Sequence, residues 1–273
     1  MQTKKIARAA LAAIAVLVMA FSPVAAVTDG ERDGDGHPFV GLMVAQDSAG
    51  NPLWRCSGTL ISSTVFLTAG HCTDGASWVE IWFDADVESG ITPDPDDVNP
   101  NGYPLTGDVG GTPNTYPEFY DLPWYMADVG VVVLDEAIDM GELGELPEAD
   151  SLDYLGQRRG QNDMWFTAVG YGLQASFPDA ASWQTVAERV RMVSYPTLIQ
   201  INNGIVGDFS LLLSNNAYTG GTCFGDSGGP NFIQGTYTIA GVTSFGMNGN
   251  CAGTGGVFRL DDADVLEWIE SFL

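Results

Sequence analysis

The sequence predicts an all-β protein. Short apolar runs recur along most of the chain, and clusters of Gly, Pro, Asn and Asp separate them, which is typical of strands joined by turns in a sandwich or barrel. Helical periodicity is confined to the last thirteen residues, and no fixed repeat period is evident. A chain of 273 residues is long enough for one large all-β unit or for two compact domains.

The N-terminal 26 residues are expected to be a secretory signal peptide. Lys4, Lys5 and Arg8 precede an uncharged apolar run, residues 9–21, and small residues lead to a cleavage site after Ala26. A membrane anchor is the alternative, but about 13 apolar residues are too few to cross a bilayer comfortably. We therefore expect a mature protein that is secreted into the extracellular space and has no membrane segment.

The charge of the mature chain excludes several partners. It would keep seven arginines, no lysine and all 35 acidic residues, which gives a formal charge of −28. Such a surface repels nucleic acid and anionic membranes, so neither is an expected partner. The many aspartates in loops are interpreted as a solvated face.

The cysteine content fits an exported protein. The four cysteines are Cys56, Cys72, Cys223 and Cys251. They suffice for two disulfides, which could be connected in three ways. A zinc site is the alternative, but there is no Cys-x-x-Cys pair, and only His71 adjoins a cysteine. No metal and no other cofactor is expected.

The first half of the mature chain contains candidate strands followed by a long polar segment. The candidate strands are residues 39–45, 58–61, 65–68 and 78–83. Residues 84–123 are rich in Pro and Gly and are predicted to form long surface loops. Asp94, Asp96 and Asp97 could chelate calcium, but their spacing matches no calcium-binding loop, so a solvated run is favoured.

A domain boundary is predicted after the next strand. Residues 128–134 form an apolar run that begins with an acid, and residues 135–155 then show no strand pattern. We expect an N-terminal unit at 27–140, a linker at 141–155 and a C-terminal unit at 156–273. Candidate strands resume at residues 164–169, 188–193, 209–213, 237–245 and 256–260.

A single amphipathic helix is expected to close the chain. Asp261 and Asp262 are candidate N-caps, and apolar residues then recur at helical spacing up to Leu273. This apolar stripe is expected to pack on the second β unit.

Ser227 lies in a glycine-rich stretch, residues 221–230, that carries the chemistry. Glycines at 225, 228 and 229 predict a tight, exposed turn with outward-pointing N–H groups, which an oxyanion hole requires. A serine nucleophile needs a base that a third group holds in place. The chain offers two histidines. His37 lies in a polar, Gly-rich run and is expected at the surface, whereas His71 follows an apolar strand, where a disulfide at Cys72 would limit its motion.

Three motifs occur in the order Leu67–Cys72 (LTAGHC), Asp128–Leu134 (DVGVVVL) and Gly225–Pro230 (GDSGGP). Together they resemble the His, Asp and Ser motifs of the trypsin/chymotrypsin family of serine endopeptidases. The resemblance runs from about Val27 to Leu273. It implies two six-stranded antiparallel β-barrels with the active site in the cleft between them, followed by the C-terminal helix. We expect a monomer whose partners are protein or peptide substrates.

The resemblance also implies a role for each residue of a triad. Ser227 would attack the carbonyl carbon, His71 would accept and return the proton, and Asp128 would hold the imidazole and stabilise its charged form. The N–H groups of Gly225 and Ser227 would bind the oxyanion, and Ser244 would orient Asp128. The implied disulfides are Cys56–Cys72 and Cys223–Cys251.

The substrate pocket implied by the resemblance carries no charge. Its floor would lie at Gly221 and its walls at Gly246 and Gly256, and Ser244 and Phe245 would border it. Because no carboxylate stands at the floor, a large apolar or aromatic substrate side chain is favoured over Arg or Lys.

Activation is expected to accompany export. In the family a newly freed aliphatic N-terminus pairs with the acid before the nucleophile, here Asp226. Val27 would provide that terminus, and it follows the expected signal cleavage site directly.

Two alternatives to a trypsin-like protease remain. The first is a catalytically silent relative that acts as a binding protein. The second is an α/β-hydrolase, which the chain order disfavours because the histidine comes first rather than last.

Overall fold

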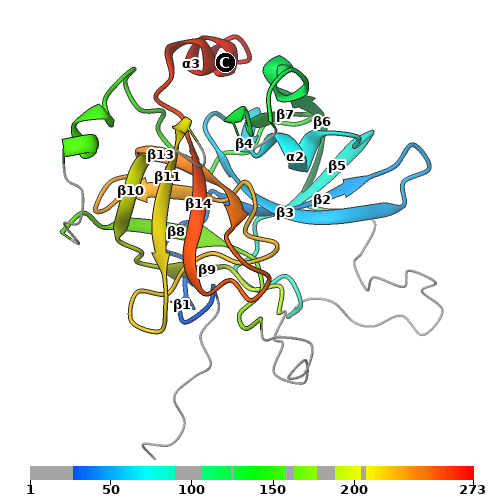
Figure 1. Cartoon of the computed structure of the whole chain (residues 1–273). Helices are drawn as coiled ribbons and strands as arrows, with labels where there is room; N and C mark the ends of the chain where they lie inside the picture. Colours follow the sequence, from blue (N-terminus) through cyan, green and yellow to red (C-terminus); the bar gives the residue numbers. More distant parts are fainter. Residues whose placement is uncertain (1–26, 90–105, 124–125, 158–162, 177–187, 204–206) are drawn as a thin grey trace, which may run out of the picture.

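The structure is a computed structural model and describes residues 27–89, 106–123, 126–157, 163–176, 188–203 and 207–273. Two β units make up most of it, and the all-β fold class is confirmed (Figure 1). The expected signal peptide at residues 1–26 and the three aspartates considered for calcium lie outside the described residues. In the described part, no helix has the length and apolar character needed to cross a membrane.

The first unit is a closed barrel of six antiparallel strands in the spatial order β2-β3-β4-β7-β6-β5. The strands are β2 (Val40–Gln46), β3 (Pro52–Leu60), β4 (Val65–Thr68), β5 (Trp78–Trp82), β6 (Val109–Thr115) and β7 (Gly130–Leu134). Strand β2 is buried along its whole length. Val40 and Met43 belong to the main core, whereas Leu42 and Val44 pack with Tyr171 of the second unit. Burial on both faces explains why β2 lacks the alternation of a half-exposed strand.

Strand β6 corrects the expectation that residues 84–123 are loops alone. Its sequence, VGGTPNT, has poor strand propensity. It nevertheless pairs with β5 on one side and with β7 on the other, because it is needed to close the barrel. A short 3₁₀ helix, η1 (Pro117–Tyr120), follows it.

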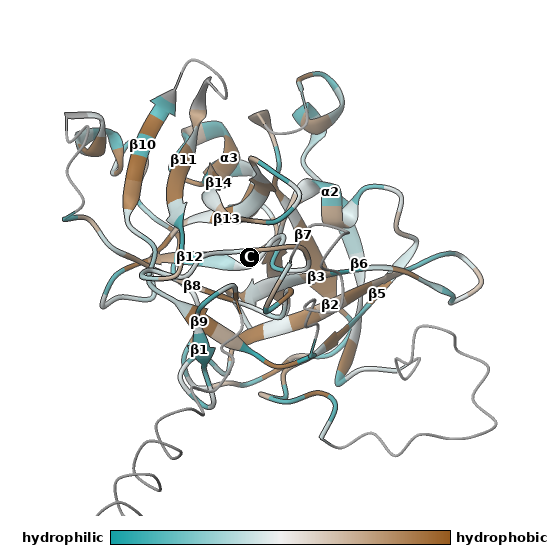
Figure 2. Ribbon diagram, turned by 60° about the horizontal axis from the view of Figure 1, so that its bottom comes forward, coloured by the Kyte–Doolittle hydropathy of each residue, from teal (hydrophilic) through white to brown (hydrophobic). Residues whose placement is uncertain are grey.

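The second unit is a curled eight-stranded sheet in the order β1-β9-β8-β12-β13-β14-β11-β10. Its strands are β1 (Glu31–Arg32), β8 (Phe166–Gly170), β9 (Met192–Ser194), β10 (Leu198–Asn203), β11 (Gly207–Asn215), β12 (Pro230–Ile233), β13 (Ile239–Gly246) and β14 (Gly253–Arg259). Strands β10 and β12 were not expected, and the strand expected at 188–193 shortens to β9. Brown, apolar stretches mark β7 of the first unit and β10 and β11 of the second (Figure 2).

The C-terminal helix α3 (Ala263–Glu270) begins at the expected N-cap. The side chain of Asp262 accepts hydrogen bonds from the N–H groups of Asp264 and Val265. The helix also reaches the first barrel, since the Trp268 ring meets the Tyr116 ring edge-on at 5.2 Å. The helix therefore packs on both units, whereas the apolar stripe alone predicted packing on the second unit. The 3₁₀ helix η3 (Asp153–Gln157) lies within the segment between the units.

His37 is not the surface residue that its polar neighbours suggest. Its side chain is only 16% exposed, and its Nδ1 lies 2.6 Å from a carboxylate oxygen of Asp33. The ring stacks on Phe232 at 5.5 Å. Asp33 in turn pairs with the buried guanidinium of Arg191 at 3.0 Å. These contacts tie the segment around His37 to the second unit.

Candidate active site

The loop before β12 makes a sharp turn around Ser227. Gly225 and Gly228 adopt left-handed conformations with φ of +98° and +79°, which disfavour any residue with a side chain. A Cβ on Gly228 would also overlap the hydroxyl of Thr68, and one on Gly225 would lie 3.1 Å from Nε of Arg55. Glycine is thus required on both sides of the serine by conformation and by space.

His71 and Asp128 come from neighbouring parts of the first barrel. His71 lies in the single-turn helix α2 (Gly70–Thr73), directly after β4, and Asp128 lies just before β7, which pairs with β4. Nδ1 of His71 is 2.8 Å from Oδ2 and 3.1 Å from Oδ1 of Asp128. The backbone N–H of His71 also donates to Oδ1 at 2.8 Å. Both carboxylate oxygens therefore hold this one residue.

Ser244 of β13 completes the surroundings of Asp128. Its hydroxyl donates to Oδ2 of Asp128 at 2.5 Å, so a residue of the second unit also fixes the acid, at the oxygen that lies nearest to Nδ1 of His71. Asp128 is fully buried, whereas the side chain of His71 is 30% exposed. A buried acid with these donors is held in one orientation and faces an imidazole that can still reach a substrate.

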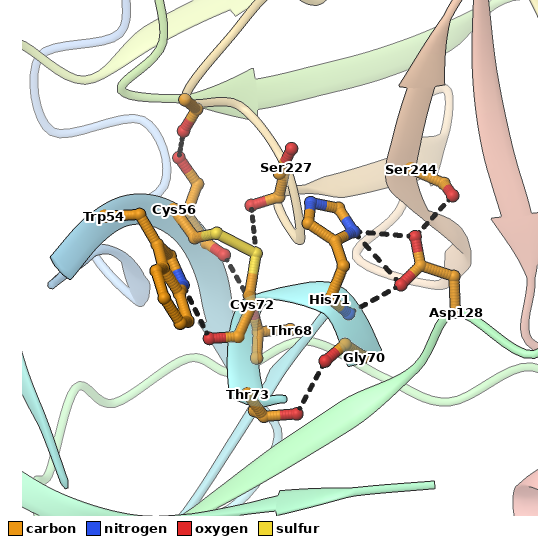
Figure 3. Close-up of a disulfide and its surroundings, with 12 residues drawn as sticks. Trp54, Cys56, Thr68, Gly70, His71, Cys72, Thr73, Asp128, Ser227 and Ser244 are labelled. Atoms are coloured by element: carbon orange, nitrogen blue, oxygen red, sulfur yellow. Dashed lines mark hydrogen bonds and ion pairs between the residues drawn. A yellow bond between two sulfur atoms is a disulfide. The ribbon is translucent and has the colours of Figure 1, made fainter. Parts of the chain in front are cut away.

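The His71 ring lies between Asp128 on one side and Ser227 on the other (Figure 3). Both His71 and Ser227 line a pocket of about 300 Å³. Among the described residues, the Ser227 hydroxyl makes no hydrogen bond. Catalytic hydrogen bonds are often long or misaligned before substrate binds, so the lack of such a bond here does not exclude proton transfer between Ser227 and His71.

The two expected oxyanion donors lie in the same turn. In the described part of the chain, neither the Gly225 N–H nor the Ser227 N–H donates to an acceptor of the protein. The carbonyl groups around them are held: that of Phe224 accepts from the Leu173 N–H at 2.8 Å, and that of Asp226 accepts from the Gly229 N–H at 2.8 Å. The loop thus presents two free donors on an anchored backbone.

The pocket contains some of the expected specificity residues. Ser244, Phe245 and Gly246 line it, but Gly221 and Gly256 are not among its lining residues. The side chain of Asn215 packs against Gly221, and the ring of Phe245 covers Gly256. Asn215 is not part of any sequence motif, whereas Phe245 was expected to border the pocket.

Three further pocket residues are not among those predicted from the sequence: Thr222 and Phe224 in the serine loop, and Thr243 on β13. Cys223 and Cys251 also line the pocket, as the disulfide that the resemblance implies. Thr222 and Phe224 could have been found from their place in the glycine-rich stretch that contains Ser227. Phe224 is 56% exposed, which leaves an apolar ring at the pocket mouth.

Asp226 is fully buried beside the nucleophile. Its carboxylate accepts hydrogen bonds from the N–H groups of Gly172 at 2.7 Å and Cys223 at 2.8 Å. Burial raises its pKa to about 6, although these two donors and the charge of Arg55 oppose the rise. When Asp226 is charged, its two hydrogen bonds and the charge of Arg55 therefore do not offset the full free-energy cost of burying that charge.

Val27 is also buried, in a small cluster with Val190 and Met192. The next residue, Thr28, fixes this segment to the second unit, since its carbonyl accepts from the Gly221 N–H at 3.1 Å and its hydroxyl donates to Asn215 at 2.7 Å. The chain here continues into residue 26, so Val27 carries an amide and no ammonium group.

Two disulfides brace the site, Cys56–Cys72 and Cys223–Cys251, and they join the pairs that the resemblance implies. Cys72 neighbours His71, and its sulfur lies 3.6 Å from the carbonyl oxygen of Ser227 (Figure 3). Cys56, His71 and Cys72 are close enough together to suggest a metal site. Their sulfurs are bonded to each other, however, so no thiolate is left to bind a metal.

Sequence comparisons place these residues among serine proteases. A family model described as Trypsin matches residues 127–269, a little over half of the chain. "Serine protease 1" of Drosophila melanogaster is 27% identical over 232 residues, which cover 85% of this chain and 78% of that protein. "Chymotrypsin" of Phaedon cochleariae is 26% identical over 246 residues, which cover 86% and 77%.

Solved structures share the same fold. A structure titled "HL collagenase" superposes with a TM-score of 0.66 at 20% identity and covers 89% of this chain and 97% of its own. "Human heparin binding protein" superposes with a TM-score of 0.61 at 17% identity, covering 89% and 95%. At these identities the structural likeness establishes the fold alone.

Proposed function

This chain belongs to the trypsin family of serine proteases, and we propose that it is a secreted endopeptidase that hydrolyses peptide bonds through an acyl-enzyme. One observation carries the proposal. Both carboxylate oxygens of the buried Asp128 bind His71, and His71 shares a pocket with Ser227. This arrangement matches the requirements for an activated serine nucleophile.

The proposed reaction uses the three residues in sequence. Ser227 Oγ attacks the scissile carbonyl carbon, and His71 takes the hydroxyl proton. Asp128 keeps the proton of the neutral ring on Nδ1 and stabilises the imidazolium that forms. His71 then protonates the leaving amine, which leaves an ester on Ser227. Water, deprotonated by His71, attacks this ester and releases the second product.

The oxyanion of each tetrahedral intermediate would lie at the serine loop. We assign its binding to the N–H groups of Gly225 and Ser227, which have no acceptor among the described residues. Donors that are oriented before the reaction stabilise the developing charge without reorganising.

We further propose a preference for large apolar or aromatic side chains at the cleaved bond. The pocket volume of about 300 Å³ and the ring of Phe245 support this preference. The residues that line the pocket, Thr222 among them, include no carboxylate. Cleavage after Arg or Lys would therefore lack an ion pair.

Activation by signal removal is a separate proposal. Cleavage after Ala26 would place a new ammonium group on Val27, a residue already buried in the second unit. Asp226 needs a cation when charged, because burial raises its pKa. N-terminal sequencing of the secreted protein is expected to begin at Val27, and a start well before or after it would exclude this route.

The cellular setting follows from the same features. We propose that the mature protein, residues 27–273, is released outside the cell as a monomer with two disulfides. Its N-terminal unit would span 27–140 and its C-terminal unit 156–273, joined by 141–155, with the exception that β1 (Glu31–Arg32) pairs with β9 in the sheet of the second unit. Protein or peptide substrates would bind between the units.

Turnover of peptides tests the proposed function. Fluorogenic peptides that differ only at the residue before the cleaved bond should be hydrolysed, fastest after Phe, Tyr or Leu. Ser227→Ala should lose this activity and keep the thermal midpoint of the wild type. Equal hydrolysis by the variant would show that Ser227 is not the nucleophile, and fastest cleavage after Arg would refute the proposed preference.

A binding protein without catalytic activity is the second candidate. The observation in its favour is the structural likeness to a protein titled as binding heparin. The charge of −28 on the mature chain would repel such a polyanion. Absence of turnover in the peptide panel would favour this candidate.

A further inference from the structure

We propose that Ser57, on strand β3 of the first barrel, is a positioning residue that sets the oxyanion-binding loop of the second unit. This inference rests on the proposed function. Ser57 lies next to the Cys56–Cys72 disulfide and is completely buried. Its side chain touches neither the pocket nor the reacting atoms, so it acts through the loop that it holds.

The hydroxyl of Ser57 joins two segments of the second unit. It donates to the carbonyl oxygen of Gly225 at 2.9 Å and accepts from the N–H of Tyr171 at 2.9 Å. The direction of these bonds is unambiguous. The Tyr171 N–H can only donate, so the single hydroxyl hydrogen is left for Gly225.

The backbone of Ser57 holds the same loop at a second point. Its N–H donates to the carbonyl oxygen of Ser227 at 2.8 Å. One residue of the first barrel therefore binds the carbonyl groups of both residues whose N–H groups are proposed to face the oxyanion.

These contacts fix the direction of the Gly225 N–H. The peptide plane before Gly225 is held by Leu173, which donates to the Phe224 carbonyl, and the plane after it is held by Ser57. Between the two planes, Gly225 has a φ of +98°. A glycine can change conformation by rotating one peptide plane, and anchoring both planes opposes that rotation.

Burial of a hydroxyl does not by itself require such partners in this protein. Ser210, on β11, is buried, and its hydroxyl has no hydrogen-bond partner within the part of the chain that the structure describes. Loss of the Ser57 hydroxyl would leave the Gly225 carbonyl and the Tyr171 N–H unsatisfied in a buried site, and the loop would move to satisfy them. Ser210→Ala is therefore a matched control.

The test separates positioning from stability. We compare Ser57→Ala, Ser57→Thr and Ser210→Ala with the wild type, measuring kcat, KM and the inhibition constant of a peptide aldehyde. The aldehyde forms a tetrahedral adduct whose oxygen needs the loop donors. Removing one oxyanion donor costs about 10²–10³-fold in kcat, so displacing donors that remain present should cost less, about 10- to 100-fold.

The expected result is a loss of kcat with little change in KM. Ser57→Ala should lose kcat and aldehyde affinity by similar factors and keep KM within about threefold, because substrate binding before reaction does not use the oxyanion donors. Ser57→Thr, which keeps the hydroxyl, and Ser210→Ala should both keep kcat.

Several outcomes would overturn the inference. One is an unchanged kcat in Ser57→Ala, and another is an effect of this variant on KM or on the thermal midpoint alone. A third is an equal loss of kcat in Ser57→Thr, which would indicate that packing and not the hydroxyl is responsible. Failure of the proposed function looks different, because the wild type itself would then show no turnover.

Discussion

The two histidines of this chain sit in nearly the same local arrangement and have different roles. Nδ1 of His71 lies 2.8 Å from Asp128, and Nδ1 of His37 lies 2.6 Å from Asp33. In each pair the backbone N–H of the histidine also donates to the same carboxylate at 2.8 Å. A buried aspartate that holds a histidine is therefore not sufficient to mark an active site.

The third partner distinguishes the pairs. The third partner of Asp128 is the neutral hydroxyl of Ser244, so the negative charge of Asp128 remains available to stabilise an imidazolium. Asp33 is completed by the guanidinium of Arg191, which also donates to the carbonyl oxygens of Val40 and Phe83. Burial alone would raise the pKa of Asp33, but the hydrogen bond and charge of His37 and the charge of Arg191 outweigh it and lower that pKa.

The free side of each ring differs as well. His71 faces the pocket that contains Ser227, whereas His37 is stacked on Phe232 and is met edge-on by Tyr237. The first pair therefore has the surroundings that the proposed proton transfer needs, and the second joins the N-terminal segment to the second unit.

The largest expected effect is on catalysis by Asp128→Asn. The amide would favour the wrong tautomer of His71, and kcat should fall by about 10⁴-fold. Asp33→Asn, the matched change in the other pair, should alter kcat by less than about tenfold. Kinetics on one fluorogenic peptide would measure both. Comparable losses in the two variants would remove the functional distinction between the pairs.

Stability should respond in the opposite order. Asp33→Asn leaves Arg191 buried without its counter-charge, and the free energy of unfolding should fall by about 3–5 kcal/mol. Asp128→Asn keeps acceptor and donor atoms near His71 and Ser244 and should cost less. Urea unfolding of both variants near neutral pH gives the comparison. A smaller loss for Asp33→Asn than for Asp128→Asn would contradict it.

A third buried acid, Asp226, provides a pH test. In a chain that retains residues before Val27, its pKa of about 6 exceeds the usual 3.8, so the folded state binds more protons than the unfolded state between these values. Proton binding by Asp226 therefore contributes fully to the free energy of unfolding at low pH. This contribution, about 3 kcal/mol, is lost as the pH rises from about 4 to about 6.

A chain beginning at Val27 should not show this loss, because its ammonium group would pair with Asp226. Urea midpoints at pH 4.5 and 7.5 for this chain and for one that keeps Ala25 and Ala26 would measure the difference. Asp226→Asn should abolish it. If both chains showed the same pH dependence, the proposed ion pair would be wrong.

The smallest expected effect concerns His37. Measurements of kcat/KM for the wild type on the same peptide across a range of pH give the reference profile. His37→Asn should show the same profile within experimental error, because His37 does not face the pocket. A shifted profile in this variant would mean that the second pair contributes to the titration of activity.

Sequence reasoning identified the local motifs and missed the long-range contacts. The contact of His71 with Asp128 and the pocket that His71 shares with Ser227 could be predicted, because each residue lies in a short pattern with its own chemistry; the catalytic roles of the three residues are proposed. The burial of His37 could not, because Asp33 and Arg191 are 158 residues apart and neighbouring glycines indicate a surface loop. Ser57 carries no signal beyond being a small residue after Cys56.

Strand prediction failed where tertiary pairing overrides propensity. Strand β6 contains two glycines and a proline, yet its position between β5 and β7 provides hydrogen bonds on both sides. The packing of Asn215 on Gly221 and of Phe245 on Gly256 likewise depends on strand register, which the sequence does not reveal.

Active-site labelling tests the central claim most directly. The mature protein is treated with a fluorophosphonate near neutral pH, and the modified residue is located by mass spectrometry. One adduct per chain is expected, on Ser227, and it should form far more slowly in Asp128→Asn and at the wild-type rate in His37→Asn. Absence of an adduct, or an adduct on a different serine, would contradict it.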